Sequence, residues 1–260
     1  MLLEVLARLR CARAAAHTSL LSRRWRGLWT RLPRLTFHSI APDPVDAALA
    51  LVTCPAQLSL LEIRVVSHHE FAPDRVSSLM DAAARLAPEK LNLLIHGDIP
   101  RSRGIGNAIE LPCFHRTTSL WLDISHVRFT LPPAGDFPVL ESLIISSCEI
   151  DLVALLQRCP RLRKLWVSVA GELCSVTVHA PLLEELWVCT SGIMLKRIEI
   201  MTPLLKKLEL RGFGGLDKEF SLSYSAPMVE ELSLWFLSTN ASFGQIWHLG
   251  SIELKTENPH

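Results

Sequence analysis

Six short segments between residues 119 and 234 share one pattern of apolar and polar positions. Each contains a triplet in which two apolar residues flank a middle residue, and five of the six open with proline. The five proline-led segments cover residues 138–145, 160–167, 181–188, 203–210 and 227–234, and the sixth is Ser119–Leu122. Side chains alternate between the two faces of a strand, so the outer residues of a triplet share one face. The pattern therefore predicts short strands that each bury one apolar face.

The spacing of these segments predicts how the strands assemble. The aligned leucines are Leu120, Leu143, Leu165, Leu186, Leu208 and Leu232, with steps of 23, 22, 21, 22 and 24 residues. Repeats of this length are typical of leucine-rich-repeat solenoids, in which parallel strands stack into one sheet and share a continuous core. We therefore expect an α/β fold, a solenoid whose parallel sheet has helical or irregular return segments.

Smaller features refine this expectation. Residues 150–159 carry apolar side chains at the spacing of one helix face, which predicts a short helix behind the sheet. Each repeat proline is predicted to open its strand, where no ladder donor is required. Two earlier stretches, Leu61–Val65 and Leu91–Leu93, resemble degenerate repeats.

The middle residues of the triplets form the candidate binding surface. They face away from the core, so folding does not require them to be apolar, yet the column is rich in tryptophan. Solenoids bind partners on this sheet face, and tryptophan is favoured in binding hot spots. The alternative is that neighbouring aromatic rings only stabilise the sheet by stacking. The predicted target-binding residues are Trp121, Ile144, Trp166, Trp187, Glu209 and Trp235, and a row alternating in charge flanks them at Lys164, Glu185, Lys207 and Glu231.

The N-terminal segment has a different pattern. Leu2, Val5, Leu6 and Leu9 lie at helical spacing, and a second stretch from Leu20 to Trp29 repeats that periodicity. Helices in about 35 residues cannot enclose a stable core alone. Their apolar faces therefore need a partner or the solenoid.

Charge and composition narrow the function classes. The 260-residue chain has a formal net charge of +1, but its first 40 residues hold eight arginines and one acid, so the remainder carries −6. A basic head on an acidic body predicts an acidic partner for the head and argues against a nucleic-acid groove. The seven cysteines lack metal-site spacing, and no apolar run is long enough for a membrane helix.

Other motifs predict no chemistry. His68-His69 are adjacent and therefore form a poor ligand pair, and Gly104-Ile-Gly106 lacks a third glycine. We accordingly predict no catalytic, cofactor or metal site, so the chain is expected to be a binding protein and not an enzyme.

One family resemblance covers most of the chain. Residues 18–37, TSLLSRRWRGLWTRLPRLTF, resemble the second half of the F-box in plant F-box/leucine-rich-repeat proteins, and Leu2–Leu9 resembles its first helix. The proline-led repeats resemble the solenoid of that family. The resemblance divides the chain into an F-box-like all-α segment (1–38), a linker with degenerate repeats (39–115) and regular repeats (116–260).

The resemblance implies a function for each part. It implies the substrate-receptor subunit of an SCF-type cullin–RING E3 ubiquitin ligase in the cytoplasm or nucleus, with a Skp-type adaptor on the F-box and an unidentified target protein on the repeats. The adaptor contacts it implies are Leu2, Leu3, Val5, Leu6, Leu9, Leu20, Leu21 and Trp25.

Two alternatives remain open. The F-box of the family normally begins with Leu-Pro just before its first helix, and this element is missing here, which favours weaker adaptor binding and a scaffold without a ligase link. An imported mitochondrial protein is the other alternative, because residues 1–26 are arginine-rich and amphipathic.

Overall fold

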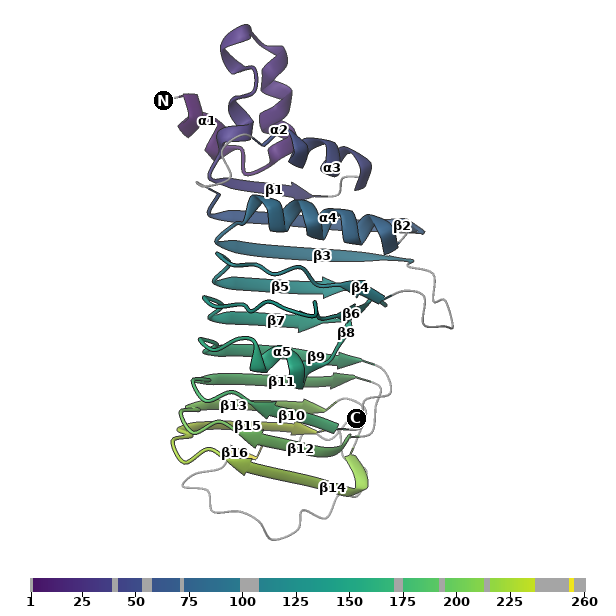
Figure 1. Ribbon diagram of the computed structural model, residues 1–260, viewed down its shortest axis with the longest axis vertical. Helices are drawn as coiled ribbons and strands as arrows, with labels where there is room; N and C mark the ends of the chain where they lie inside the picture. Colours follow the sequence, from purple (N-terminus) through teal and green to yellow (C-terminus); the bar gives the residue numbers. More distant parts are fainter. Residues whose placement is uncertain are drawn as a thin grey trace.

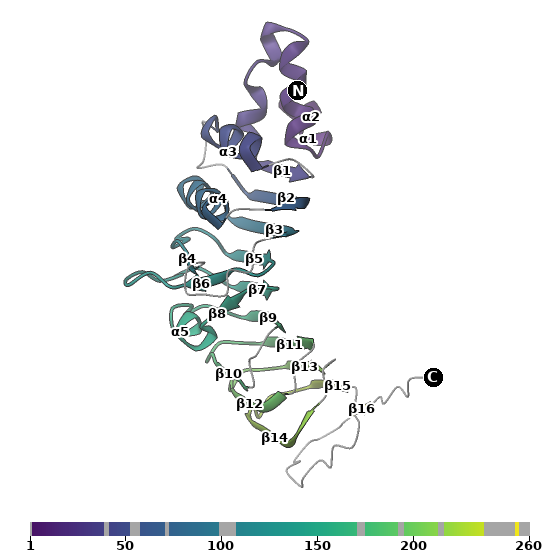
Figure 2. The same ribbon diagram turned by 90° about the vertical axis from the view of Figure 1, so that its right-hand side faces the viewer.

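The computed structural model describes residues 2–38, 42–52, 58–70, 73–98, 108–170, 175–191, 195–212, 216–236 and 253–254. Figure 1 shows a tall stack of strands with a helical segment at its N-terminal end, and Figure 2 shows that a second layer covers only one face of the stack. The expected fold class is therefore confirmed at the level of a solenoid-like α/β fold with a large parallel sheet.

The main sheet joins the repeats side by side. Its described strands are all parallel to their neighbours, in the order β1-β2-β3-β5-β7-β9-β11-β13-β15-β16. The bounds are β1 Arg34–His38, β2 Leu60–Glu70, β3 Lys90–Asp98, β5 Ser119–Ile124, β7 Ser142–Ser146, β9 Lys164–Ala170, β11 Glu185–Ser191, β13 Lys207–Gly212, β15 Glu231–Phe236 and β16 Glu253–Leu254. The two degenerate repeats lie in β2 and β3. The main sheet therefore continues through residue 115, where the degenerate repeats were expected to give way to the regular ones.

One ladder of leucines occupies the buried face of this sheet. Its members lie in register on successive strands, and each is at most 2% exposed: Leu35, Leu61, Leu91, Leu120, Leu143, Leu165, Leu186 and Leu208. Leu232, on β15, is only partly buried. Full burial of a leucine side chain contributes about 1.5–3 kcal/mol, so the ladder is a main source of stability.

The repeat prolines lie in turns ahead of the strands, so the expectation that they open the strands was wrong. In one repeat the N–H of Leu183 donates to the carbonyl of Ala180 at 3.2 Å, which makes Pro181 the second residue of a β-turn. Proline suits that position because its ring fixes φ near the value the turn needs. Equivalent bonds join residues 140 to 137, 162 to 159, 205 to 202 and 229 to 226.

The second layer begins with two helices, continues with short strands and one further helix, and ends with three longer strands. Its elements are α3 Pro42–Ala50, α4 Pro73–Leu86, β4 Ala108–Glu110, β6 Arg128–Thr130, β8 Glu149–Ile150, α5 Leu152–Gln157, β10 Ser175–His179, β12 Leu195–Met201 and β14 Leu216–Ser225. The helix expected within residues 150–159 is confirmed as α5. The carboxylate of Asp151 caps it by accepting a hydrogen bond from the N–H of Ala154 at 3.0 Å.

Two short parallel sheets in this layer, β4-β6-β8 and β10-β12-β14, differ from the helical or irregular returns that the sequence predicted. In the second sheet, Val176 and Val178 pair with Ile198 and Ile200, and all four side chains are at most 4% exposed. These β-branched residues alternate with more exposed ones, which is a strand pattern of period two. The return segments therefore contribute a second apolar face to the core.

The N-terminal segment is helical and packs on the end of the solenoid. It contains α1 Leu2–Arg8, α2 Ala12–His17, η1 Thr18–Leu20, η2 Arg23–Trp25 and η3 Leu28–Arg31. α1 packs against η3, and α2 packs against η3 and β1. Leu6, Ala12, Ala15 and Trp29 are buried there. The solenoid thus covers part of the apolar surface that these short helices cannot cover themselves.

Candidate functional site

The outward face of the main sheet carries the column of middle residues that the sequence predicted. In register, the column reads Asn92, Trp121, Ile144, Trp166, Trp187, Glu209 and Ser233. All of these side chains are at least partly exposed, whereas the flanking residues of the leucine ladder are buried. The column therefore points away from the core, as strand alternation requires.

Four consecutive strands, β5, β7, β9 and β11, place apolar side chains side by side in this column. We call Trp121, Ile144, Trp166 and Trp187 the aromatic strip. Trp166 is 47% exposed, although its ring stacks on Trp187 with centroids 6.1 Å apart. Neighbouring strands lie about 4.8 Å apart, so the strip is about 14 Å long. This is enough surface for several side chains of a bound protein.

At the C-terminal side of the strip, Arg211 joins two predicted site residues. Its Nε donates a hydrogen bond to the carboxylate of Glu209, and its guanidinium carbon lies 6.0 Å from the centre of the Trp235 ring. The register places Arg211 opposite Trp235, one row beyond the strip. Arg211 thus links Glu209 and Trp235. Its positive charge compensates the negative charge of Glu209 at this end of the strip.

A row of ion pairs borders the aromatic strip where the strands begin. The ammonium group of Lys164 lies 2.7 Å from the carboxylate of Glu185, and that of Lys207 lies 2.9 Å from Glu231. The hydrogen bond to Glu231 raises the pKa of Lys207. The alternating signs expected at these positions are therefore arranged as cross-strand pairs, a polar rim beside an apolar centre.

The eight predicted adaptor contacts in the N-terminal segment differ in exposure: some are exposed, some are half-buried and one is buried. Leu20 is 84% exposed and Leu21 is 71% exposed, the two highest values for large apolar side chains among the described residues. Val5 and Leu9 are also exposed. Leu2, Leu3 and Trp25 are half-buried, and Leu3 and Trp25 pack against the core.

Leu6 is the exception among these contacts. It is only 1% exposed and belongs to the core of the chain itself. α1 presents one apolar stripe, and the face that includes Leu6 is taken up by the packing of α1 against the rest of the chain. In this structure, Leu6 is therefore not part of a surface that a partner could contact.

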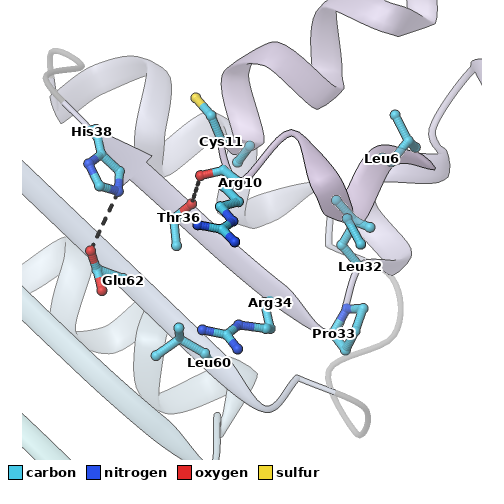
Figure 3. A pocket seen from close by; sticks show the side chains of 12 residues that line it. Leu6, Arg10, Cys11, Leu32, Pro33, Arg34, Thr36, His38, Leu60 and Glu62 are labelled. Atoms are coloured by element: carbon cyan, nitrogen blue, oxygen red, sulfur yellow. Dashed lines mark hydrogen bonds and ion pairs between the residues drawn. The ribbon is translucent and has the colours of Figure 1, made fainter. Parts of the chain in front are cut away.

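A pocket that the sequence gave no sign of lies where the N-terminal segment meets the sheet. It has a volume of about 530 Å³ and is lined from α1, α2, β1, β2 and the residues that join them. Figure 3 shows the side chains of Arg10, Arg34, Thr36, His38 and Glu62 around it. These residues are distant in sequence, so only the packing of α1 and α2 on β1 brings them together.

Among the described residues, no group of three or more His, Cys, Asp or Glu side chains is arranged to hold a metal ion.

Two buried cysteines have raised pKa values. Burial raises the pKa of Cys148 and of Cys159 to about 12, so both thiols stay protonated near neutral pH.

Some of the motifs considered in the sequence cannot be placed. Outside the described residues lie Gly104-Ile-Gly106, the side chains of His68 and His69, and the cysteines at 54 and 174. Among the helices that the structure describes, none is long and apolar enough to cross a membrane.

Comparison with protein-family models, with curated proteins and with solved structures finds no match for this chain.

Proposed function

We propose that the chain is the substrate-receptor subunit of an SCF-type cullin–RING E3 ubiquitin ligase. Its N-terminal helical segment would bind a Skp-type adaptor, and the aromatic strip on its main sheet would bind the target protein. The chain itself would act by binding, in the cytoplasm or nucleus, while the ligase core supplies the catalysis.

The exposure of Leu20 and Leu21 carries the adaptor half of this proposal. Two adjacent leucines at 84% and 71% exposure are costly to leave in water, and burying such a side chain contributes about 1.5–3 kcal/mol. They lie within the stretch of residues 18–37 that resembles an F-box. The exposed arginines Arg23, Arg24 and Arg26 follow them closely in sequence. Exposed apolar side chains in a basic segment suit an acidic adaptor that has an apolar groove.

The outward face of the sheet supports the target half. The aromatic strip is apolar and half-exposed, and the ion pairs beside it form a polar rim. Specific protein interfaces have this arrangement of an apolar centre with tryptophan anchors and a hydrated border. The opposite face of the sheet is occupied by the core, so the outward face is the one available for a partner.

A second candidate function is a leucine-rich-repeat scaffold without a ligase link. The burial of Leu6 favours it, because one residue of the stripe that the resemblance assigns to the adaptor is occupied within the chain. In that case the aromatic strip would still bind a protein, while the N-terminal segment would only cap the first strand of the sheet.

Co-elution separates the two candidates. The full chain is mixed with a purified Skp-type adaptor and analysed by size-exclusion chromatography with light scattering. A complex of one chain with one adaptor is the result expected for a ligase receptor. Separate elution at concentrations of tens of micromolar would leave the scaffold function instead.

A further inference from the structure

The pocket between the N-terminal segment and the sheet has the size of a small-molecule site. Its volume of about 530 Å³ lies within the range of about 300–1,000 Å³ that ligand pockets occupy. Its walls come from α1, α2, the first two strands of the sheet and the residues that join them, so the N-terminal segment and the sheet line it together (Figure 3).

The lining divides into an apolar part and a charged part. The apolar part is made by Leu6, Ala7, Ala12, Leu32, Pro33 and Leu60. The charged part contains Arg10 and Arg34, both exposed, and Figure 3 shows their guanidinium groups turned toward the same open space in front of β1. A ligand here would meet carbon on one side and two cations on the other.

The one acid of the lining is already occupied. The carboxylate of Glu62 accepts a hydrogen bond from Arg64 at 2.7 Å and another from Asn92 at 3.1 Å, and His38 lies 3.4 Å from it. Within the described part of the chain, no ion pair joins Arg10 or Arg34 to an acid. The pocket therefore presents two uncompensated positive charges beside an apolar wall, which is an environment for an anion.

The backbone around Arg10 is held in place. Arg10 adopts a left-handed conformation with φ of 50°, and its carbonyl accepts a hydrogen bond from the hydroxyl of Thr36 at 2.5 Å. This bond ties the link between α1 and α2 to β1. A fixed backbone lowers the ordering cost of binding, because the link that carries Arg10 is already ordered before a ligand binds.

We infer that this pocket binds a small organic anion, with an apolar body against Ala7, Pro33 and Leu60 and a carboxylate or phosphate head between Arg10 and Arg34. The planar guanidinium fork matches the oxygens of both head groups. The pocket contains neither Leu20 and Leu21 nor any residue of the aromatic strip, and the inference does not depend on the proposed ligase function.

Calorimetric titration of the full chain with matched probes tests the inference. 1-Naphthoate supplies an aromatic body with a carboxylate, phenyl phosphate supplies a phosphate head, and 1-naphthamide is the neutral match of the first. We expect at least one anionic probe to bind, with 1-naphthamide at least tenfold weaker than 1-naphthoate. The stronger of the two anions identifies the preferred head group.

Three single variants assign the binding to the pocket. Arg10→Gln and Arg34→Gln should each weaken the anion at least tenfold, whereas Arg13→Gln removes the same charge from α2 outside the pocket and should leave binding unchanged. Thermal melting of each variant checks that the fold is intact. Cys11 lines the pocket, so the bound anion should slow its alkylation, read by mass spectrometry, without slowing that of Cys189 on the sheet.

Three results would overturn the inference. The first is no binding of either anion at millimolar concentration. The second is equal binding of 1-naphthoate and 1-naphthamide. The third is equal weakening by all three arginine variants, which would indicate attraction by net charge and no specific site.

Discussion

The indole rings of Trp166 and Trp187 stack across the adjacent strands β9 and β11, with centroids 6.1 Å apart and planes inclined by 25°. The stack does not bury the pair, because Trp166 remains 47% exposed. Stacking therefore stabilises the sheet to some degree, and it also holds the two rings in a fixed arrangement while Trp166 stays largely at the surface. The tryptophan column could serve mainly stability or mainly binding. The two hypotheses differ in how much of the free energy of unfolding they assign to the stacked rings.

Replacing either ring with serine should cost little stability. An aromatic pair contributes about 0.5–1.5 kcal/mol beyond area burial, so Trp166→Ser should lower the melting temperature by a few degrees. The control is Leu165→Ala on the same strand, where a fully buried side chain is truncated at a cost of about 2–5 kcal/mol. A loss for Trp166→Ser as large as that for Leu165→Ala would show that the tryptophans serve the fold, and would count against a binding role.

Leu20 and Leu21 should be dispensable for folding. They are mostly in water in the free chain, so the double change Leu20→Ser with Leu21→Ser should alter the free energy of unfolding by less than about 0.5 kcal/mol. Leu6→Ala, in the same segment, should cost about 2–5 kcal/mol because Leu6 is 1% exposed. Denaturant titration of the three proteins measures this. Equal destabilisation by both changes would mean that Leu20 and Leu21 pack within the chain.

The ion pair between Lys164 and Glu185 should contribute little to stability. Its groups are 2.7 Å apart and both remain partly exposed, and exposed pairs contribute about 0–1 kcal/mol. A double-mutant cycle with Lys164→Met and Glu185→Gln should therefore give a coupling energy below about 1 kcal/mol that falls further in 0.5 M salt. A coupling above about 2 kcal/mol would mean that the charged rim is a structural element of the sheet.

The buried thiols predict a loss of stability in alkaline solution. Burial raises the pKa of Cys148 and Cys159 from 9.0 to about 12, so between these values the unfolded chain releases thiol protons that the native chain keeps. The free energy of unfolding must then fall as pH rises from about 9 toward 12. The double variant Cys148→Ala with Cys159→Ala should show a shallower fall across pH 8–11. Identical slopes for both proteins would contradict the buried, protonated state of these thiols.

The main sheet could be predicted from sequence because its signal repeats. Each leucine of the ladder recurs after 21–24 residues in the regular part of the chain, and strand alternation then fixes which residues face outward. Trp121, Trp166 and Trp187 were placed correctly for this reason. The prolines were misplaced because a missing N–H is equally compatible with a turn and with the first residue of a strand.

The remaining features depend on contacts between distant residues. An apolar stripe on α1 shows that Leu6 needs a partner, but it does not show whether the partner lies in this chain. β10 and β12 have only two buried alternating residues each in their centres, too short a pattern to separate from irregular structure. At the pocket, Arg10 lies next to Thr36, and no pattern of neighbouring residues in the sequence predicts this contact.

The affinity of the full chain for a purified Skp-type adaptor, measured by calorimetry, tests the receptor function most directly. The protein is compared with Leu20→Ser/Leu21→Ser and with a control, Leu182→Ser/Met228→Ser, which removes exposed apolar side chains from the turns before β11 and β15. We predict a dissociation constant of micromolar or tighter for the protein and the control, and a loss of about hundredfold or more for the Leu20/Leu21 variant. No measurable binding by the unaltered chain, or equal losses in both variants, would contradict the proposed receptor function.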